Sequence, residues 1–181
     1  MSSQLRVDKI VPVDGAPTGG GGGIIQVVQA SKTDTDSFSV ATTAQHQYTT
    51  LTATITPKFD TSKILIMMHL TLCASESDVK VHYGVQRTIG GSGATSVGVG
   101  DAASNRQRMS GGMLIETNPG FTLNYSFLDS PSTTSACAYY PIVGHDSSGS
   151  KTFNINKSNG DSDSAQNARY MSSIILYEVS G

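Results

Sequence analysis

The chain has 181 residues, of which 37% are hydrophobic and 14% charged, and its formal net charge is −2. A chain of this length fits one domain and buries enough surface to fold without disulfides or a metal. The share of charged residues is well below the usual value of about 25%. The abundance of Ser, Thr and Gly disfavours a helical protein. The net negative charge gives no reason to expect nucleic-acid binding.

The N-terminal segment is predicted to be an extended arm. Pro12 and Pro17 interrupt its scattered apolar positions, so neither a helix nor a strand ladder can run through it. Five consecutive glycines follow at residues 19–23 and predict a flexible hinge. We expect residues 1–18 to be a docking arm that buries apolar side chains against a partner, with packing on its own domain as the alternative. The expected docking residues are Leu5, Val7, Ile10, Val11 and Val13.

After the hinge, apolar and polar residues alternate with a period of two, which is typical of strands. We expect strands at residues 24–30, 38–43, 51–56, 63–74, 79–85, 113–117, 121–127, 135–143, 151–155 and 169–179. In residues 63–74 the even positions are apolar and the odd positions mixed, so this strand is expected to be covered on both sides. Without helical periodicity between the strands, residues 24–181 are predicted to form an all-β head, an antiparallel β-sandwich or jelly roll.

Two long connections and two cysteines complete this outline. Residues 90–112 are rich in Gly, Ala and Ser, and residues 156–167 read NKSNGDSDSAQN. Connections of this length are usually functional or bound to a partner. Cys73 and Cys137 lie in strand-like sequence without a partner at metal-ligand spacing, so we expect two free, buried thiols. The N-terminus lacks the apolar core of a signal peptide and no apolar run is long enough for a membrane span, so we expect a soluble protein without membrane insertion.

The sequence shows no arrangement that predicts catalysis. The glutamates are few and no carboxylate pair stands out, and residues 145–147 (His-Asp-Ser) read as a solvated turn because adjacent side chains cannot relay a proton in line. Neither a dinucleotide fingerprint nor a phosphate loop occurs. We therefore expect no enzymatic activity and no cofactor. A hydrolase whose carboxylates, such as Glu116 or Asp161, converge only in the fold is a distant alternative.

Metal binding has two weak candidates. Asn159, Asp161 and Asp163 are spaced like the first half of a calcium loop, but the glycine and the final glutamate of that loop are absent, so a hydrated polar turn is favoured and ion binding stays open. His69 and His82 could face each other on neighbouring strands, yet two imidazoles make an incomplete site, and polar packing between strands is favoured.

Tyr139 and Tyr140 are the candidate ligand-binding residues. Together with residues 90–112 they could offer aromatic and hydroxyl contacts to a sugar or a protein partner. The alternative is that one tyrosine belongs to the core and the other is an ordinary exposed ring.

Several segments resemble a known family. The opening pattern S-x-L-x-V-x-x-I-x-P-x-x-G at residues 3–15 resembles the N-terminal arm of small structural proteins of tailed bacteriophages, notably those of marine and cyanobacterial hosts. Four later segments resemble the same family and occur in the same order as in that family. They are IIQVVQ after the glycines, ITPKFDTSKILIM at 55–67, FLDSPSTTSA at 127–136 and SSIILYEVSG at 172–181.

This resemblance implies a non-enzymatic virion structural protein of the tail-fibre, head-fibre, knob or capsid-decoration type. Such proteins often have trimeric β-sandwich or jelly-roll heads, so we expect a homotrimer that attaches to other virion proteins through its arm. Its expected location is the virion, with assembly in the host cytoplasm. The alternative function is the head of a short tail fibre or spike that binds a host receptor or glycan. The sequence leaves the position on the particle open.

Overall fold

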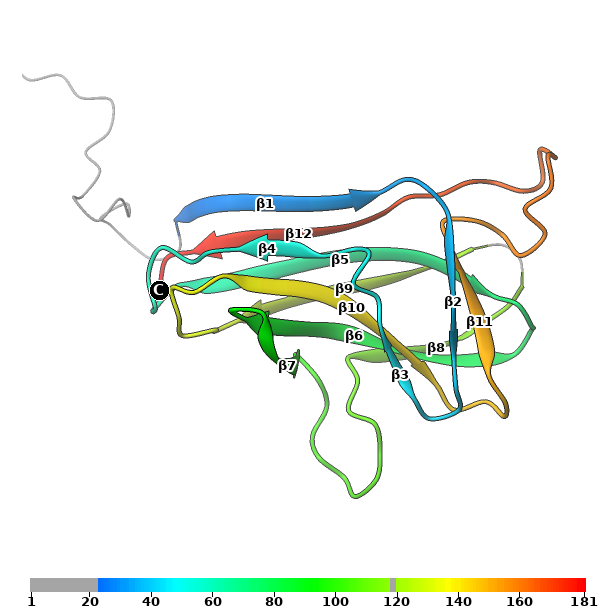
Figure 1. Ribbon diagram of the computed structural model, residues 1–181, viewed down its shortest axis with the longest axis horizontal. Helices are drawn as coiled ribbons and strands as arrows, with labels where there is room; N and C mark the ends of the chain where they lie inside the picture. The colour runs from blue at the N-terminus through cyan, green and yellow to red at the C-terminus, as the bar shows by residue number, and fades with distance from the viewer. Residues whose placement is uncertain (1–22, 118–119) are drawn as a thin grey trace, which may run out of the picture.

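The computed structural model describes residues 23–117 and 120–181, and the predicted arm with its docking residues lies outside these ranges. The described residues form antiparallel strands and no helix (Figure 1), so none of them belongs to a helix that could cross a membrane. The strands are β1 (Ile24–Lys32), β2 (Asp36–Val40), β3 (Gln45–Gln47), β4 (Ala53–Ile55), β5 (Lys63–Ala74), β6 (Val79–Ile89), β7 (Ser92–Val97), β8 (Gly111–Ile115), β9 (Phe121–Asp129), β10 (Cys137–His145), β11 (Lys151–Ile155) and β12 (Ser172–Val179).

The strands form two sheets. In sheet A, the strands β1, β12, β5 and β9 lie side by side. Along the last residues of β5, β11 pairs with β5 instead of β12, and β2 pairs with the other edge of β11. Sheet B has β10 and β6 at its centre, with β3 and β4 beside β10 and with β7 and β8 beside β6.

The order of pairing identifies the fold as a jelly roll. The pairs are nested along the chain, because β1 pairs with β12, β4 with β10, β5 with β9, and β6 with β7 and β8. A long hairpin whose two arms roll up together produces this nesting and distributes the strands over two facing sheets. The predicted all-β, antiparallel jelly-roll head is confirmed by the strand pairing of the chain itself.

The core lies between the two sheets. The even positions of β5, among them Ile64, Ile66 and Leu70, are fully buried, as are Val81 and Val85 of β6. Each side chain of this kind stabilises the folded state by roughly 1.5–3 kcal/mol when it is removed from water. Because apolar residues alternate with polar ones along the strand, one face of the strand is buried. Cys73 and Cys137 are free and buried, as predicted. Burial raises the pKa of both thiols and so disfavours the reactive thiolate form.

Two strands were not expected from the sequence. β7 lies inside the segment predicted to be a long connection. It can pair with β6 because Gly90, Gly91 and Gly93 adopt positive φ angles of 58°, 80° and 67° and reverse the chain in a tight turn. β7 and β3 consist mostly of small or polar residues at the edges of sheet B, so neither carries an apolar alternation.

The expected coverage of β5 is correct for only part of the strand. From Leu70 to Ala74 the strand is buried on both faces, but Met67 and His69 on its outer face are exposed. His69 and His82, which the sequence allowed to face each other, do not lie on neighbouring strands, because the chain crosses from sheet A to sheet B at residues 75–78 and places the two histidines in different sheets.

Candidate functional site

The outer face of sheet A carries no charged residue over three successive rows. Directly paired residues of antiparallel strands point to the same side, so the register between β1, β12, β5 and β9 defines these rows. In this order of strands, the first row is Val27, Tyr177, Leu65 and Leu128, the second is Gln29, Ile175, Met67 and Ser126, and the third is Ser31, Ser173, His69 and Asn124. We call these rows the uncharged face.

The first two rows of the uncharged face are rich in exposed apolar side chains. Val27 is 53% exposed, Met67 46% and Leu128 44%, and they lie beside half-buried apolar neighbours on β5 and β12. A solvated sheet face is normally polar, and exposed sheets usually carry charges that oppose association. The uncharged face is therefore a candidate interface.

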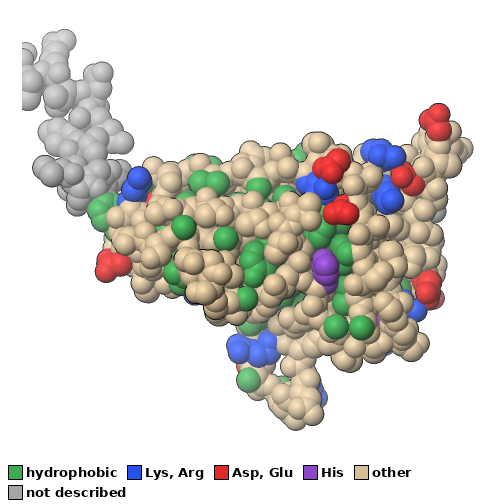
Figure 2. Space-filling model, viewed as in Figure 1, with side chains coloured by type: hydrophobic (Ala, Val, Ile, Leu, Met, Phe, Trp, Pro, Cys, Tyr) green, Lys and Arg blue, Asp and Glu red, His purple; other side chains and the backbone are tan. Residues whose placement is uncertain are grey.

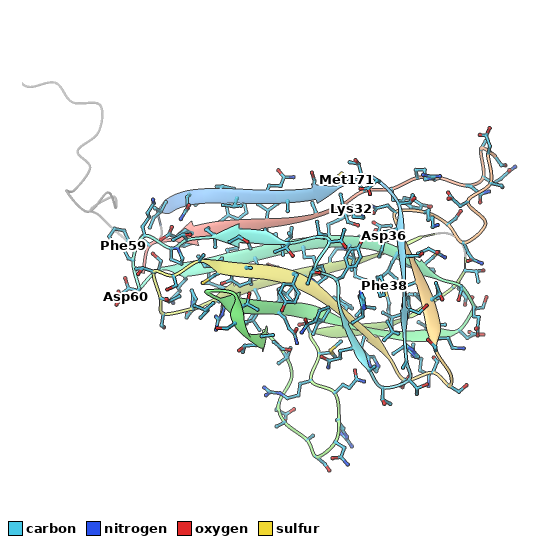
Figure 3. The ribbon with its side chains drawn as sticks, viewed as in Figure 1. Lys32, Asp36, Phe38, Phe59, Asp60 and Met171 are labelled. Carbon is cyan, nitrogen blue, oxygen red and sulfur yellow. The ribbon has the colours of Figure 1, made fainter. Side chains whose placement is uncertain are left out.

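Both described chain ends lie beside this face. β1 begins at Ile24, which is 60% exposed and pairs with Val179 at the end of β12. The backbone N–H of Ser180 donates to the carbonyl of Gly23 at 3.0 Å. Figure 3 labels Phe59 at this end of the roll. The first described residues and the end of β12 therefore lie beside the first row of the uncharged face.

A buried carboxylate holds this end together. Glu178 is fully buried, and its oxygens accept hydrogen bonds from Nε2 of Gln26 at 2.5 Å and from the backbone N–H of Lys58 at 2.6 Å. The same Nε2 of Gln26 donates to the carbonyl of Thr56 at 2.7 Å. Since Gln26 lies on β1 and Thr56 follows β4, these bonds join the edges of the two sheets where the arm begins.

The outer face of sheet B is covered differently. Ile142 of β10 pairs with Gly84 and points outward, yet it is fully buried. A Cβ atom on Gly84 would lie 2.9 Å from Oγ of Ser110, and one on Gly144 would lie 2.9 Å from Oε1 of Gln107. Residues 107–110, at the end of the loop between β7 and β8, therefore lie against β6 and β10 beside Ile142.

The candidate ligand-binding tyrosines both belong to the interior. Tyr139 is 0% exposed and its hydroxyl donates to Asp129 at 2.8 Å, whereas Tyr140 faces the other side of β10 and is 5% exposed. Burial raises the pKa of both phenols, and the charge of Asp129 raises that of Tyr139 further. Neither ring presents an open face to solvent, so the structure offers no stacking surface for a ligand at these two residues.

Asp129 also pairs with Arg87 in a buried cluster that the sequence did not reveal. Oδ2 of Asp129 accepts from both the Arg87 guanidinium and the Tyr139 hydroxyl. Burial opposes the charge of Arg87, but the hydrogen bond and the charge of Asp129 outweigh it, so the pKa of Arg87 is raised. One satisfied carboxylate and its cation form a structural ion pair between the sheets, without a second carboxylate for acid–base catalysis.

The other chemical candidates are separated or neutralised. His145 is buried and its Nε2 donates to the carbonyl of Val40 at 2.8 Å, whereas Asp146 is exposed, so these neighbours form no relay. Asp161 lies 2.7 Å from Nε of Arg169 and 3.9 Å from Nζ of Lys157, which compensate its charge. Within residues 23–117 and 120–181, no three His, Cys, Asp or Glu side chains are grouped for a metal ion.

Comparison with known proteins gives only distant structural likeness. No family model and no curated protein matches the chain. The infectious bursal disease virus Gt strain structure superimposes with a TM-score of 0.47 at 9% identity, covering 97% of this chain and 44% of that one. The D431N mutant VP2 protein of that virus in derived T=1 particles gives 0.44 at 12% identity, covering 96% and 40%. The crystal structure of its VP2 subviral particle gives 0.42 at 13%, covering 85% and 39%. These neighbours are viral particle proteins, and this chain spans less than half of their length.

Proposed function

We propose that this chain is a non-enzymatic structural protein of a bacteriophage particle, of the fibre, knob or capsid-decoration type. It docks on the particle through residues 1–18 and displays the jelly-roll head. The observation that carries the proposal is the uncharged face of sheet A, which lies beside the chain end from which the arm extends. The ordered resemblance of five segments to phage structural proteins supports it.

The arm supplies the attachment. Its expected docking residues, Leu5, Val7, Ile10, Val11 and Val13, are apolar. Burial of each contributes roughly 1.5–3 kcal/mol before the cost of ordering the arm. Several copies on one particle add these contributions, because once the first arm is bound the others are held near their sites.

The uncharged face supplies contacts between copies of the chain. Three such faces can meet around a threefold axis without burying an unpaired charge, which would cost several kcal/mol. Val27, Met67 and Leu128 are the side chains that gain most, because they are the most exposed apolar residues in the rows. The head is then a homotrimer whose arms dock on other virion proteins, and its place is the virion after assembly in the host cytoplasm.

Light scattering after size exclusion tests the copy number. We expect a trimer for the full chain and for the chain without residues 1–18, and a monomer for Met67→Lys. The matched control is Leu114→Lys, because Leu114 is an apolar residue of similar exposure, 51%, on β8 of sheet B. A monomeric wild-type chain, or dissociation caused equally by both substitutions, contradicts the role of the uncharged face.

Incorporation into particles tests the arm. The chain without residues 1–18 should fold with an unchanged circular dichroism spectrum but be missing from purified particles. Normal incorporation of this truncated chain overturns the docking role.

A further inference from the structure

The loop at residues 98–110 carries two arginines and one aspartate, Asp101. It projects between β7 and β8 in Figure 1, and Figure 2 shows blue side chains on it. Its cations, Arg106 and Arg108, border a pocket of about 560 Å³ between the loop, β7 and β3. The pocket is lined by Gln45, Ala94, Thr95, Ser96, Val99, Asn105, Arg106, Gln107 and Arg108.

No carboxylate lines this pocket, and Asp101, the acidic residue of the same loop, is not among its lining residues. Its lining contains two arginines and no carboxylate, and within the described ranges neither arginine forms an ion pair. Arg87 and Arg169, in contrast, each have an aspartate partner. Arg106 also borders a second pocket of about 500 Å³, but there Asp146 supplies the opposite charge. The first pocket is therefore the one suited to an anion.

The loop is braced before any ligand binds. The N–H of Gly100 donates to the carbonyl of Met109 at 3.2 Å, and Nε of Arg108 donates to the carbonyl of Gly100 at 2.7 Å, which closes the loop on itself. Nε2 of Gln107 donates to the carbonyl of Thr43 at 2.5 Å and ties the loop to the turn before β3. A braced loop loses little conformational freedom on binding.

The pocket offers two kinds of polar partner. The brace uses one of the five N–H donors of Arg108, and the planar guanidinium groups of Arg106 and Arg108 match the two oxygens of a carboxylate. Thr95, Ser96 and Asn105 add hydroxyl and amide groups that can bond to sugar hydroxyls. The lining holds no aromatic ring on which a nucleic-acid base could stack.

We propose that this pocket binds a carboxylate-bearing saccharide, with Arg106 and Arg108 on the carboxylate and the β7 hydroxyls on the ring. The site is independent of the docking arm and of the uncharged face, so it stands or fails separately from the proposed function. It lies on sheet B, whereas the uncharged face lies on sheet A.

Isothermal titration of the full chain with tetragalacturonate, in which every ring carries a carboxylate, tests the site. We expect saturable binding at low salt, at least tenfold weaker binding for Arg106→Gln, and a smaller loss for Arg106→Lys, which keeps the charge but not the planar fork. Lys63→Gln is the matched control, because it removes one exposed positive charge from β5 of sheet A. Urea unfolding of each variant verifies its fold.

Three outcomes overturn the proposal. The first is the absence of saturable binding to tetragalacturonate. The second is equal weakening by Arg106→Gln and Lys63→Gln, which indicates attraction to the net charge alone. The third is equal or tighter binding to neutral maltotetraose or to a ten-nucleotide oligothymidine, which indicates a site for a neutral sugar or for single-stranded nucleic acid.

Discussion

The outer faces of the two sheets differ in how their apolar residues are covered. On sheet B, Ile142 points outward and is fully buried where residues 107–110 of the chain lie against β6 and β10. On sheet A, Val27 and Met67 point outward and are about half exposed. The comparison teaches that sheet B buries Ile142 within the chain and leaves Leu114 exposed, whereas sheet A leaves several apolar side chains exposed in adjacent rows.

Glycines explain how the loop reaches sheet B. Gly84 and Gly144 have no side chains, so Ser110 and Gln107 approach the sheet to distances that a Cβ atom would block. The three uncharged rows of sheet A contain no glycine, and side chains stand at every position. The absence of side chains at Gly84 and Gly144 therefore lets the end of the loop pack directly on sheet B.

The largest effect is expected where the loop covers sheet B. Ile142→Ala should lower the free energy of unfolding by about 2–5 kcal/mol, because it leaves a cavity under the loop. Leu114→Ala is the control, since Leu114 is 51% exposed and its truncation should change stability by about 0.5 kcal/mol or less. Urea unfolding measures both. Similar, small losses for the two variants would mean that the loop does not bury Ile142.

The second-largest loss of stability is expected at Gly98, the first residue of the loop between β7 and β8. Gly98 has φ of 59°, and a Cβ atom there would lie 2.5 Å from the Tyr125 hydroxyl, which donates to the carbonyl of Val97 at 2.8 Å. Gly98→Ala should therefore cost roughly 1–3 kcal/mol and speed tryptic cleavage after Arg106.

Gly91→Ala separates backbone strain from packing at Gly98. Gly91 has φ of 80° but open space around its Cβ position, so only the backbone strain of about 1 kcal/mol applies. Equal losses of stability and equal cleavage rates for the two variants would show that the contact with Tyr125 is unimportant.

A smaller effect on folding, with a clear effect on assembly, is expected on sheet A. Ser126→Lys places a charge in the second row of the uncharged face and should change the unfolding of the isolated head by about 0.5 kcal/mol or less. It should nevertheless shift the trimer to monomers in light scattering. Thr88→Lys on the outer face of sheet B is the control, and it should leave the trimer intact.

The smallest effect is expected where the two sheets meet. The ring of His46 on β3 stacks on that of Phe38 on β2, with centroids 4.1 Å apart. Burial lowers the pKa of His46, although Asp36 opposes this shift. The unfolded chain therefore binds the proton more readily, and the contribution of His46 to stability, complete above about pH 6.5, is lost as the pH falls towards its lower folded pKa.

Replacement of His46 by phenylalanine tests this dependence. His46→Phe keeps a ring on Phe38 but removes the titrating group. Urea unfolding of both proteins between pH 7 and pH 5 should show a greater loss for the wild type. A parallel loss in both proteins would assign the pH dependence to other groups.

Much of the fold could be predicted from local pattern. The bounds of β5 and β11 agree with those expected, because alternation and turn residues mark both strands. β7 was missed because its small and polar residues at a sheet edge carry no such pattern. The burial of Tyr140 was also missed, because two tyrosines next to each other point to opposite faces and the sequence does not say whether either face is covered.

The sequence by itself determined the all-β class, the core face of β5 and the buried state of the cysteines, because alternation with a period of two marks the strands and their buried positions. Only the tertiary structure decided the nested pairing, the uncharged face and the pocket at Arg106 and Arg108. The physical reason is that each of these features joins residues far apart in the chain. Their proximity depends on which strands pair and in which register, and local preference encodes neither.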